Sequence, residues 1–305
     1  MGVDLGSTTA KAVVVDESAS IVASSTIAMG AVSRAGMQRC IDEALALAEI
    51  DASDLSGTIS TGYGRKLVPG VTRSYTEITC HARGVAAMMP GVRLIVDIGG
   101  QDSKAITVDK DGLVVDFAMN DRCASGTGRF YEVLARAIEV DLPELGELAM
   151  RGSQDLEVSS MCATFAETEI VSLMAQDMRV EDIASSVHRA IAGRTLALIA
   201  QVGRRAPVVM TGGVAKNGAA VHFLSRALDH EVLVPAQPQI TGAYGAALLA
   251  MESFMRGRPT VADVPGADSL FPRVDHMAAG HSCAGCNGEL QGKVELGTAI
   301  PVRGS

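Results

Sequence analysis

The 305-residue chain has a composition typical of a folded protein of about two domains, with 48% apolar and 20% charged residues. No apolar run approaches the ~20 residues of a membrane-spanning helix. The net charge of −9 and the 3% of aromatic residues argue against general nucleic-acid binding, which uses basic surfaces and stacking rings. The chain opens without a basic and then apolar leader, so we expect it in the cytoplasm, where its six cysteines favour metal, redox or buried roles over disulfides.

An internal repeat is the first organising feature of the sequence. Residues 3–22 align without a gap to residues 96–115, and identical residues include the pairs Asp4/Asp97, Gly6/Gly99 and Lys11/Lys104. Both copies alternate β-branched stretches with Gly, Asp or Ser turns, which predicts strand, glycine turn, strand, polar turn and strand. We therefore expect a duplicated domain half that opens with a β-hairpin.

Helical patterns separate these strands. Ser33 is a plausible N-cap for the first predicted helix, and Pro90 and Gly91 end the second. The predicted helices cover residues 34–49, 76–89, 128–140, 165–176, 180–201 and 242–255, and a further strand covers residues 208–211. Strands alternating with helices predict an α/β fold whose sheets are covered by helices, with a cleft between two duplicated halves.

Three glycine turns are candidates for binding a polyphosphate, because glycine lets backbone amides approach an anion and hydroxyl or lysine side chains add donors. We expect Asp4 and Asp97, at the two strand ends, to hold Mg²⁺ through water molecules. The third turn reads as a strand, a glycine pair and the start of a helix, whose amides would face phosphate or a nucleoside. The predicted cofactor-binding residues are Asp4, Gly6, Ser7, Thr8, Thr9 and Lys11 in the first turn, Asp97, Gly99, Gly100, Gln101 and Lys104 in the second, and Gly212, Gly213, Ala215 and Lys216 in the third.

The order of these turns resembles the actin, sugar kinase and Hsp70 superfamily of ATPases. The motifs are Asp-x-Gly-Ser-Thr-Thr from Asp4, Asp-x-Gly-Gly-Gln-Asp from Asp97, and Thr-Gly-Gly from Thr211. The resemblance implies two ribonuclease-H-like domains with ATP and Mg²⁺ in the cleft between them. Neither a P-loop motif nor a dinucleotide-binding G-x-G-x-x-G motif is present in the sequence.

Two cysteines precede predicted helices, where the helix dipole favours the thiolate. Cys123 stands in Cys-Ala-Ser-Gly-Thr-Gly-Arg-Phe and Cys162 in Cys-Ala-Thr-Phe-Ala-Glu-Thr-Glu. Burial in the core and ligation of an iron–sulfur cluster are both open from the residues alone. Two thiolates per chain are too few for a [4Fe–4S] cluster, which a two-fold dimer would complete.

These two motifs resemble the activator ATPases of 2-hydroxyacyl-CoA dehydratases and the related ATPase subunits of ATP-dependent benzoyl-CoA reductase. The resemblance implies a homodimer, or a pair with a related ATPase chain, in which Cys123 and Cys162 of both chains hold one shared [4Fe–4S] cluster. It implies ATP-driven transfer of one low-potential electron from ferredoxin or flavodoxin to the dehydratase, or to the reductase in the alternative reading. We also place Gly126 and Gly128, beside Cys123, at the nucleotide site.

Gln101 and Asp102 are our candidates for orienting the water that attacks the γ-phosphate, because both lie on the second glycine turn. Hydrogen bonding within its own turn is an equally good role for Asp102. A small-molecule kinase of the same fold and a chaperone-like nucleotide-dependent module are the rival functions. The sparse aromatic residues argue against a sugar cleft.

We expect the first ATPase domain to comprise residues 1–92 and 240–256, and the second, which carries the cluster cysteines, to comprise residues 93–239. Residues 257–305 are predicted to be a linker and a tail. Cys283 and Cys286 in this tail form a C-x-x-C motif, which fits either a loosely docked tail or half of a metal or redox site. His188, which has no ligand-like spacing, is expected at the surface or as a satisfied core residue.

Overall fold

A five-stranded mixed sheet forms the N-terminal part of the fold, which we describe from a computed structural model covering residues 1–120, 124, 126–158 and 163–257. The strand order is β3-β2-β1-β4-β5. The hairpin strands pair antiparallel, while β4 and β5 add in parallel. The strands are β1 (Gly2–Leu5), β2 (Thr9–Val15), β3 (Ile21–Ala28), β4 (Ile59–Thr61) and β5 (Arg73–Ser74).

A second sheet repeats this topology. Its strand order is β8-β7-β6-β9-β10. As in the first sheet, the first three strands along the chain pair antiparallel, and the last two add in parallel. The strands are β6 (Leu94–Ile98), β7 (Ser103–Val108), β8 (Val114–Asn120), β9 (Val208–Thr211) and β10 (Val232–Leu233). The predicted fold class, α/β with duplicated ribonuclease-H-like halves, is confirmed.

The duplication extends to individual hydrogen bonds. Asp4 pairs with Lys11 across the first hairpin, and Asp97 pairs with Lys104 across the second. The backbone N–H of Gly6 donates to the carbonyl three residues on, at 3.1 Å, and Gly99 does the same at 2.9 Å. Both copies also carry a register irregularity between the second and third strands. The repeated letters in the sequence therefore correspond to one repeated turn geometry.

Helices cover the sheets, and most begin where the sequence predicts. Ser33 caps α1 through its hydroxyl, which accepts from the N–H of Gly36, and Thr76 caps α2 in the same way. The helices are α1 (Arg34–Leu47), α2 (Glu77–Met88), α3 (Gly128–Ala137), α4 (Leu142–Met150), α5 (Ala163–Ala175), α6 (Val180–Val202), α7 (Gly218–Leu228) and α8 (Thr241–Met255). Three short 3₁₀ turns are η1 (Ala52–Asp54), η2 (Arg65–Leu67) and η3 (Gly213–Lys216). Helix α4 was not expected from the sequence, and α7 was expected only as the helix that follows the third glycine turn.

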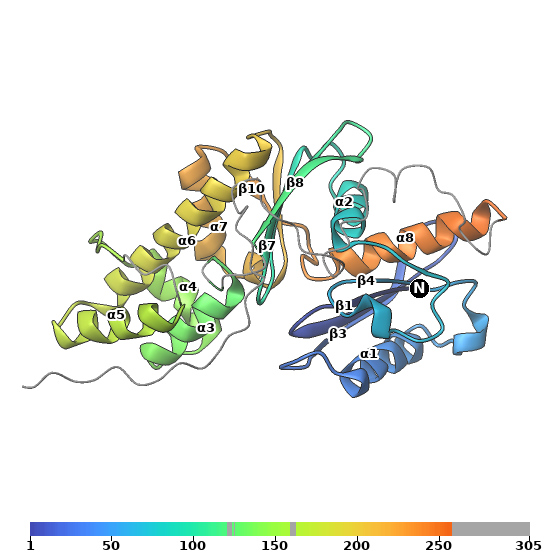
Figure 1. Cartoon of the computed structure of the whole chain (residues 1–305), viewed down its shortest axis with the longest axis horizontal. Helices are drawn as coiled ribbons and strands as arrows, with labels where there is room; N and C mark the ends of the chain where they lie inside the picture. The colour runs from blue at the N-terminus through green and yellow to red at the C-terminus, as the bar shows by residue number, and fades with distance from the viewer. Residues whose placement is uncertain (121–123, 125, 159–162, 258–305) are drawn as a thin grey trace, which may run out of the picture. The chain divides into compact units, whose positions relative to one another are not determined.

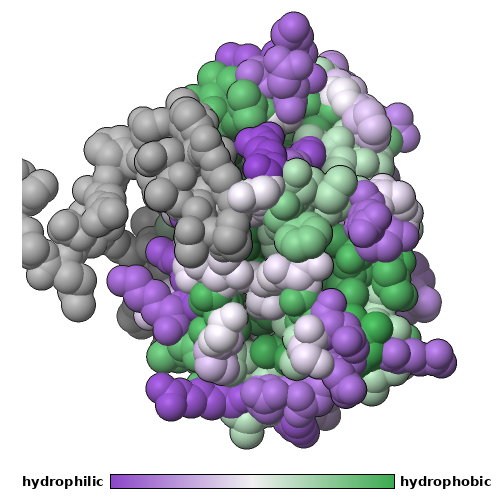
Figure 2. Space-filling view, turned by 90° about the vertical axis from the view of Figure 1, so that its right-hand side faces the viewer, coloured by the Kyte–Doolittle hydropathy of each residue, from purple (hydrophilic) through white to green (hydrophobic). Residues whose placement is uncertain are grey.

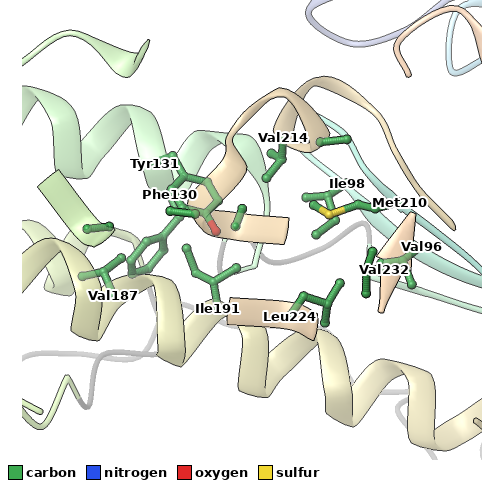
Figure 3. Close-up of a cluster of buried hydrophobic side chains, with 14 of the residues drawn as sticks. Val96, Ile98, Phe130, Tyr131, Val187, Ile191, Met210, Val214, Leu224 and Val232 are labelled. Carbon is green, nitrogen blue, oxygen red and sulfur yellow. The ribbon is translucent and has the colours of Figure 1, made fainter. Parts of the chain in front are cut away.

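The largest hydrophobic core lies between the second sheet and helices α3, α4, α6 and α7 (Figure 1). Strand residues such as Val96 and Met210 meet Phe130 of α3 and Ile191 of α6 in this core (Figure 3). The opposite face of the same sheet packs on α2, although the predicted boundary assigns that helix to the first domain. Helix α8 packs on the first sheet through Ala243 and neighbouring apolar residues. The domain boundaries themselves stay a prediction.

Helices α2 and α8 cross at very close range. A Cβ atom built on Gly245 would lie 1.8 Å from the carbonyl oxygen of Cys80, and one on Gly84 would lie 2.0 Å from that of Thr241. Glycine at these two positions therefore lets the helix backbones touch. This crossing connects the two sheets, because α2 packs on the second and α8 on the first.

The surface of the molecule is a mixture of hydrophilic and apolar residues. In the face shown in Figure 2, hydrophilic side chains are interspersed with apolar ones. Within the described residues, no helix combines the length and the apolar character needed to cross a bilayer.

Candidate functional site

The three glycine turns meet at one cavity of about 1020 Å³, to which both sheets contribute. Gly126 and Ala215 are not among its lining residues: Ala215 is buried in the core of the second sheet. The predicted residues that do line the cavity are Asp4, Gly6, Ser7, Thr8, Thr9, Lys11, Asp97, Gly99, Gly100, Gln101, Asp102, Lys104, Gly128, Gly212, Gly213 and Lys216.

The first turn places a buried carboxylate next to a lysine. Asp4 is the last residue but one of β1, and its Oδ2 accepts a hydrogen bond from Lys11 Nζ at 3.1 Å. Gly6 leaves little room beside it, since an added Cβ would lie 3.1 Å from the carbonyl oxygen of Thr9 and 3.2 Å from Lys11 Nζ. The turn thus presents backbone close to a charged pair at the cavity wall.

The second turn surrounds a buried lysine with carboxylates. Lys104 is 2% exposed, and its Nζ lies 2.8 Å from Asp102, 3.3 Å from Asp97 and 3.9 Å from Glu77. Burial opposes the charge of Lys104, but these three carboxylates raise its pKa above the usual range. Burial also raises the pKa of Glu77, although Lys104 counteracts the effect. Lys104 is therefore a fixed cation that holds the carboxylates of this turn together.

The carboxylate of Asp97 has partners on both of its oxygens. Its Oδ1 accepts a hydrogen bond from the Thr211 hydroxyl at 2.8 Å and lies 3.7 Å from His81 Nδ1. Burial alone would raise the pKa of Asp97, but His81 and Lys104 outweigh it and hold the pKa well below the usual range. Asp97 is consequently an ionised carboxylate with a fixed orientation.

The third turn differs in one respect from its prediction. The glycine pair leads into the single 3₁₀ turn η3, and the α-helix begins only at Gly218, because Asn217 caps it. Gly212 has φ +85°, and an added Cβ would lie 2.2 Å from the carbonyl oxygen of Ile98. Only glycine fits where this turn crosses the end of β6.

Sequence reasoning missed several lining residues. Tyr63 follows Gly62, which comes directly after β4 as Gly212 comes directly after β9, so the repeated Thr-Gly pair was a readable signal for this part of the wall. Nothing local in the sequence points to the place of Glu77 beside Lys104 at the cavity. The missed lining residues include Tyr63, Glu77, His81, Asn217 and Gln239.

A second part of the cavity wall comes from α3, α4 and the start of α7, and it carries Glu132 and Glu147 besides the following residues. These are Tyr131 of α3, Leu142, Gly146 and Met150 of α4, and Asn217 at the start of α7. The cavity therefore combines the glycine turns with a slot between α4 and α7 that is lined by apolar residues and by Glu147. Such a combination suits a ligand with a phosphate chain and a flat base.

The predicted water-orienting residues lie on the cavity wall. Gln101 is exposed there, whereas Asp102 is bound to Lys104 at 2.8 Å. In the described part of the chain, no three His, Cys, Asp or Glu side chains are grouped to hold a metal ion directly. Cys123 and Cys162 lie outside the described residues, as do Cys283 and Cys286. Cys40 and Cys80 are buried free thiols, and burial raises the pKa of Cys80 to about 12.

Comparisons with known proteins find relatives over most of the chain. The activator of lactoyl-CoA dehydratase from Anaerotignum propionicum is 42% identical over 253 residues, which cover 83% of this chain and 97% of the relative. The solved activator of 2-hydroxyisocaproyl-CoA dehydratase from Clostridium difficile, with bound ADPNP, superposes with a TM-score of 0.81 at 39% identity, covering 86% of this chain and 98% of that one. A benzoyl-CoA reductase subunit from Thauera aromatica is 33% identical over 208 residues, which cover 66% of this chain and 73% of the relative.

The match to a family model covers most of the described structure. It spans residues 1–250, which include both sheets, all three glycine turns and both cysteine motifs. The chain belongs to the BadF/BadG/BcrA/BcrD ATPase family.

Proposed function

We propose that the protein hydrolyses ATP to drive the transfer of one low-potential electron to a 2-hydroxyacyl-CoA dehydratase. The observation that carries this proposal is the pair of duplicated glycine turns, each with its Asp–Lys pair, at one cavity. Relatives that cover more than four fifths of the chain are named as activators of such dehydratases. We place the protein in the cytoplasm, with reduced ferredoxin or flavodoxin as the electron donor.

The residues present fit MgATP. Glycines 6, 99, 100 and 212 leave backbone open to the cavity where a Cβ atom would collide or crowd its neighbours. Asp4 and Asp97 would hold Mg²⁺ through water, since each is buried, bound to a lysine and placed at the cavity wall. The carboxylates of Asp4, Asp97, Asp102 and Glu77 outnumber Lys11 and Lys104, and this excess of negative charge favours a divalent cation. The nucleoside would occupy the slot between α4 and α7.

We propose that Cys123 and Cys162 are ligands of an iron–sulfur cluster. Each cysteine comes shortly before a helix, and these helices, α3 and α5, pack against one another in the described structure. Two cysteines supply half of the thiolates that a [4Fe–4S] cluster takes, so we propose a homodimer with the cluster shared across its two-fold axis. The bound cluster would supply the one-electron carrier.

Hydrolysis needs a residue that orients water at the γ-phosphate. Gln101 and Asp102 both face the cavity from the second turn. Asp102 already bonds to Lys104, whereas Gln101 is exposed at the wall. We therefore propose Gln101 as the water-orienting side chain and Asp102 as its support.

The ATPase subunit of a benzoyl-CoA reductase is the second candidate function. It is favoured by the 33% identity to the Thauera aromatica reductase chain, although that match covers a smaller part of this protein. In this case the electron would pass to the reductase's catalytic subunits, and the partner ATPase would be a related chain.

Anaerobic purification tests the proposal. We expect about four irons per dimer, a brown colour and ATP hydrolysis, with the dehydratase component co-purifying. Cys123→Ser and Cys162→Ser should each lose the iron. Cys40→Ser, at a buried thiol in the core between the first sheet and α1, should keep it. A colourless, iron-free wild-type protein that phosphorylates a sugar or a carboxylate would contradict the proposal and support a kinase.

A further inference from the structure

A buried histidine lies directly behind the nucleoside end of the cavity. His188 of α6 is fully buried, and its ring centroid lies 4.8 Å from that of Tyr131 and 5.8 Å from that of Phe223. Val187 and Ile191 on the same helix face the surrounding core (Figure 3). His188 does not line the cavity and is assigned no role in ATP hydrolysis.

The contacts of His188 determine its tautomer. Its Nδ1 lies 2.7 Å from the carbonyl oxygen of Ala184, which can only accept, so Nδ1 carries the proton. The other nitrogen, Nε2, is then an acceptor, and it lies 3.0 Å from the amide nitrogen Nδ2 of Asn217. Burial lowers the pKa of His188 to about 4, so the ring is neutral at pH 7.

This acceptor determines the orientation of the Asn217 side chain. With Nδ2 donating to His188, the oxygen Oδ1 is turned toward the first turn of α7, where it accepts from the N–H groups of Ala219, at 3.0 Å, and Ala220, at 3.2 Å. A flipped amide would place two donors against those N–H groups and an oxygen against the lone pair of His188. The histidine and the helix cap therefore specify the same rotamer.

The oriented cap forms part of the cavity wall. Asn217 and Ala219 line the cavity on the α7 side, and Gly146 lines it on the α4 side. A Cβ atom on Gly146 would lie only 2.8 Å from Asn217 Oδ1, so α4 and the cap are in close contact. The width of the slot between α4 and α7 thus depends on where Asn217 Oδ1 points.

We propose that His188 is a positioning residue for the nucleoside: its neutral Nε2 holds the Asn217 amide in the orientation that caps α7 and shapes the slot between α4 and α7. This inference rests on the proposed binding of ATP in the cavity. His188 acts through Asn217 and touches neither phosphate nor metal. Its loss should weaken nucleotide binding more than it slows hydrolysis.

A matched pair of substitutions isolates the acceptor. Gln and Met have similar length and volume, but only Gln offers an oxygen near the position of Nε2. We expect His188→Met to raise the KM for ATP about tenfold with kcat lowered less than twofold, and His188→Gln to stay within about threefold of the wild-type KM. His230→Met, the same change at an exposed histidine, is the control and should leave KM unchanged.

The outcomes separate the two proposals. Equal KM values for His188→Met and the wild type overturn the positioning role. A His188→Gln variant whose KM for ATP is as high as that of His188→Met, with an unchanged Tm, also overturns it. Wild-type protein that binds no MgATP overturns the proposed function instead. Nitrogen-15 NMR of the histidine rings adds a test that needs no variant: His188 should be protonated at Nδ1, and protonation at Nε2 in the folded protein would refute the inference.

Discussion

The helix crossing of α2 and α8 yields the sharpest stability prediction. In Gly245→Ala the new Cβ would lie 1.8 Å from the carbonyl oxygen of Cys80 and 2.8 Å from the backbone nitrogen of Gly84. These are backbone atoms, so no side chain can rotate away, and the helices must separate by about 1.5 Å to reach a normal contact. Overpacking of this kind costs ~1–3 kcal/mol.

Part of this cost is offset, because alanine is a better helix former than glycine by roughly 0.5–1 kcal/mol. We therefore expect a net loss of about 1–2 kcal/mol in the free energy of unfolding, which corresponds to a fall in Tm of roughly 2–4 °C for a chain of this size. The control is Gly193→Ala in α6, where an added Cβ meets nothing within 4 Å. That variant should gain about 1 kcal/mol.

Thermal unfolding of the two variants, followed by circular dichroism under identical conditions, measures the difference. The crossing also positions α2, which brings Glu77 and His81 to the cavity, so Gly245→Ala should weaken MgATP binding as well. A Gly245→Ala protein as stable as Gly193→Ala would show that the helices separate without cost. The requirement for glycine at position 245 would then be refuted.

Three further outcomes are expected. Thr211→Val removes the hydroxyl that donates to Asp97 at 2.8 Å and should lower kcat for ATP hydrolysis about tenfold in a phosphate-release assay, with Thr195→Val, away from the cavity, as the comparison. Lys104→Met removes the buried cation shared by Asp97, Asp102 and Glu77 and should lower the free energy of unfolding by ~3–5 kcal/mol in urea titrations; an unchanged midpoint would contradict the network. The pKa of His188 falls from 6.5 to about 4 on folding, so the unfolded state binds more protons between these pH values. The free energy of unfolding of the wild type should therefore fall by about 2 kcal/mol relative to that of His188→Met between pH 7 and pH 5. Parallel curves of unfolding free energy against pH for the two proteins would exclude this linkage.

The sequence predicted the repeated parts of the fold because they are local. A hairpin with glycine and aspartate at its turn is specified by residues close in the chain, and the second copy confirmed the pattern of the first. The N-cap Ser33 was predicted for the same reason, whereas Thr76, expected as the first residue of its helix, is the N-cap of α2. The fold class and most helix positions followed from these signals.

The remaining parts of the site depend on contacts distant in sequence. His81 reaches Asp97 and Thr241 only because α2 and α8 cross, and the crossing depends on how the two sheets pack. The buried pair of His188 and Asn217 is equally invisible to spacing, since 29 residues separate its members. The helix α4 was missed because its apolar positions were not recognised, although Pro143 at its start was a readable signal.

The proposed coupling of ATP hydrolysis to electron transfer can be measured by following the cluster and the release of phosphate in one reaction. The reduced protein is mixed anaerobically with its co-purified dehydratase component, and cluster oxidation is recorded by absorbance while phosphate release is recorded in parallel. We predict that oxidation of the cluster requires MgATP, and that ADP or a non-hydrolysable analogue does not support it. Phosphate release at the same rate with the cluster remaining reduced would contradict the coupling of ATP hydrolysis to electron transfer.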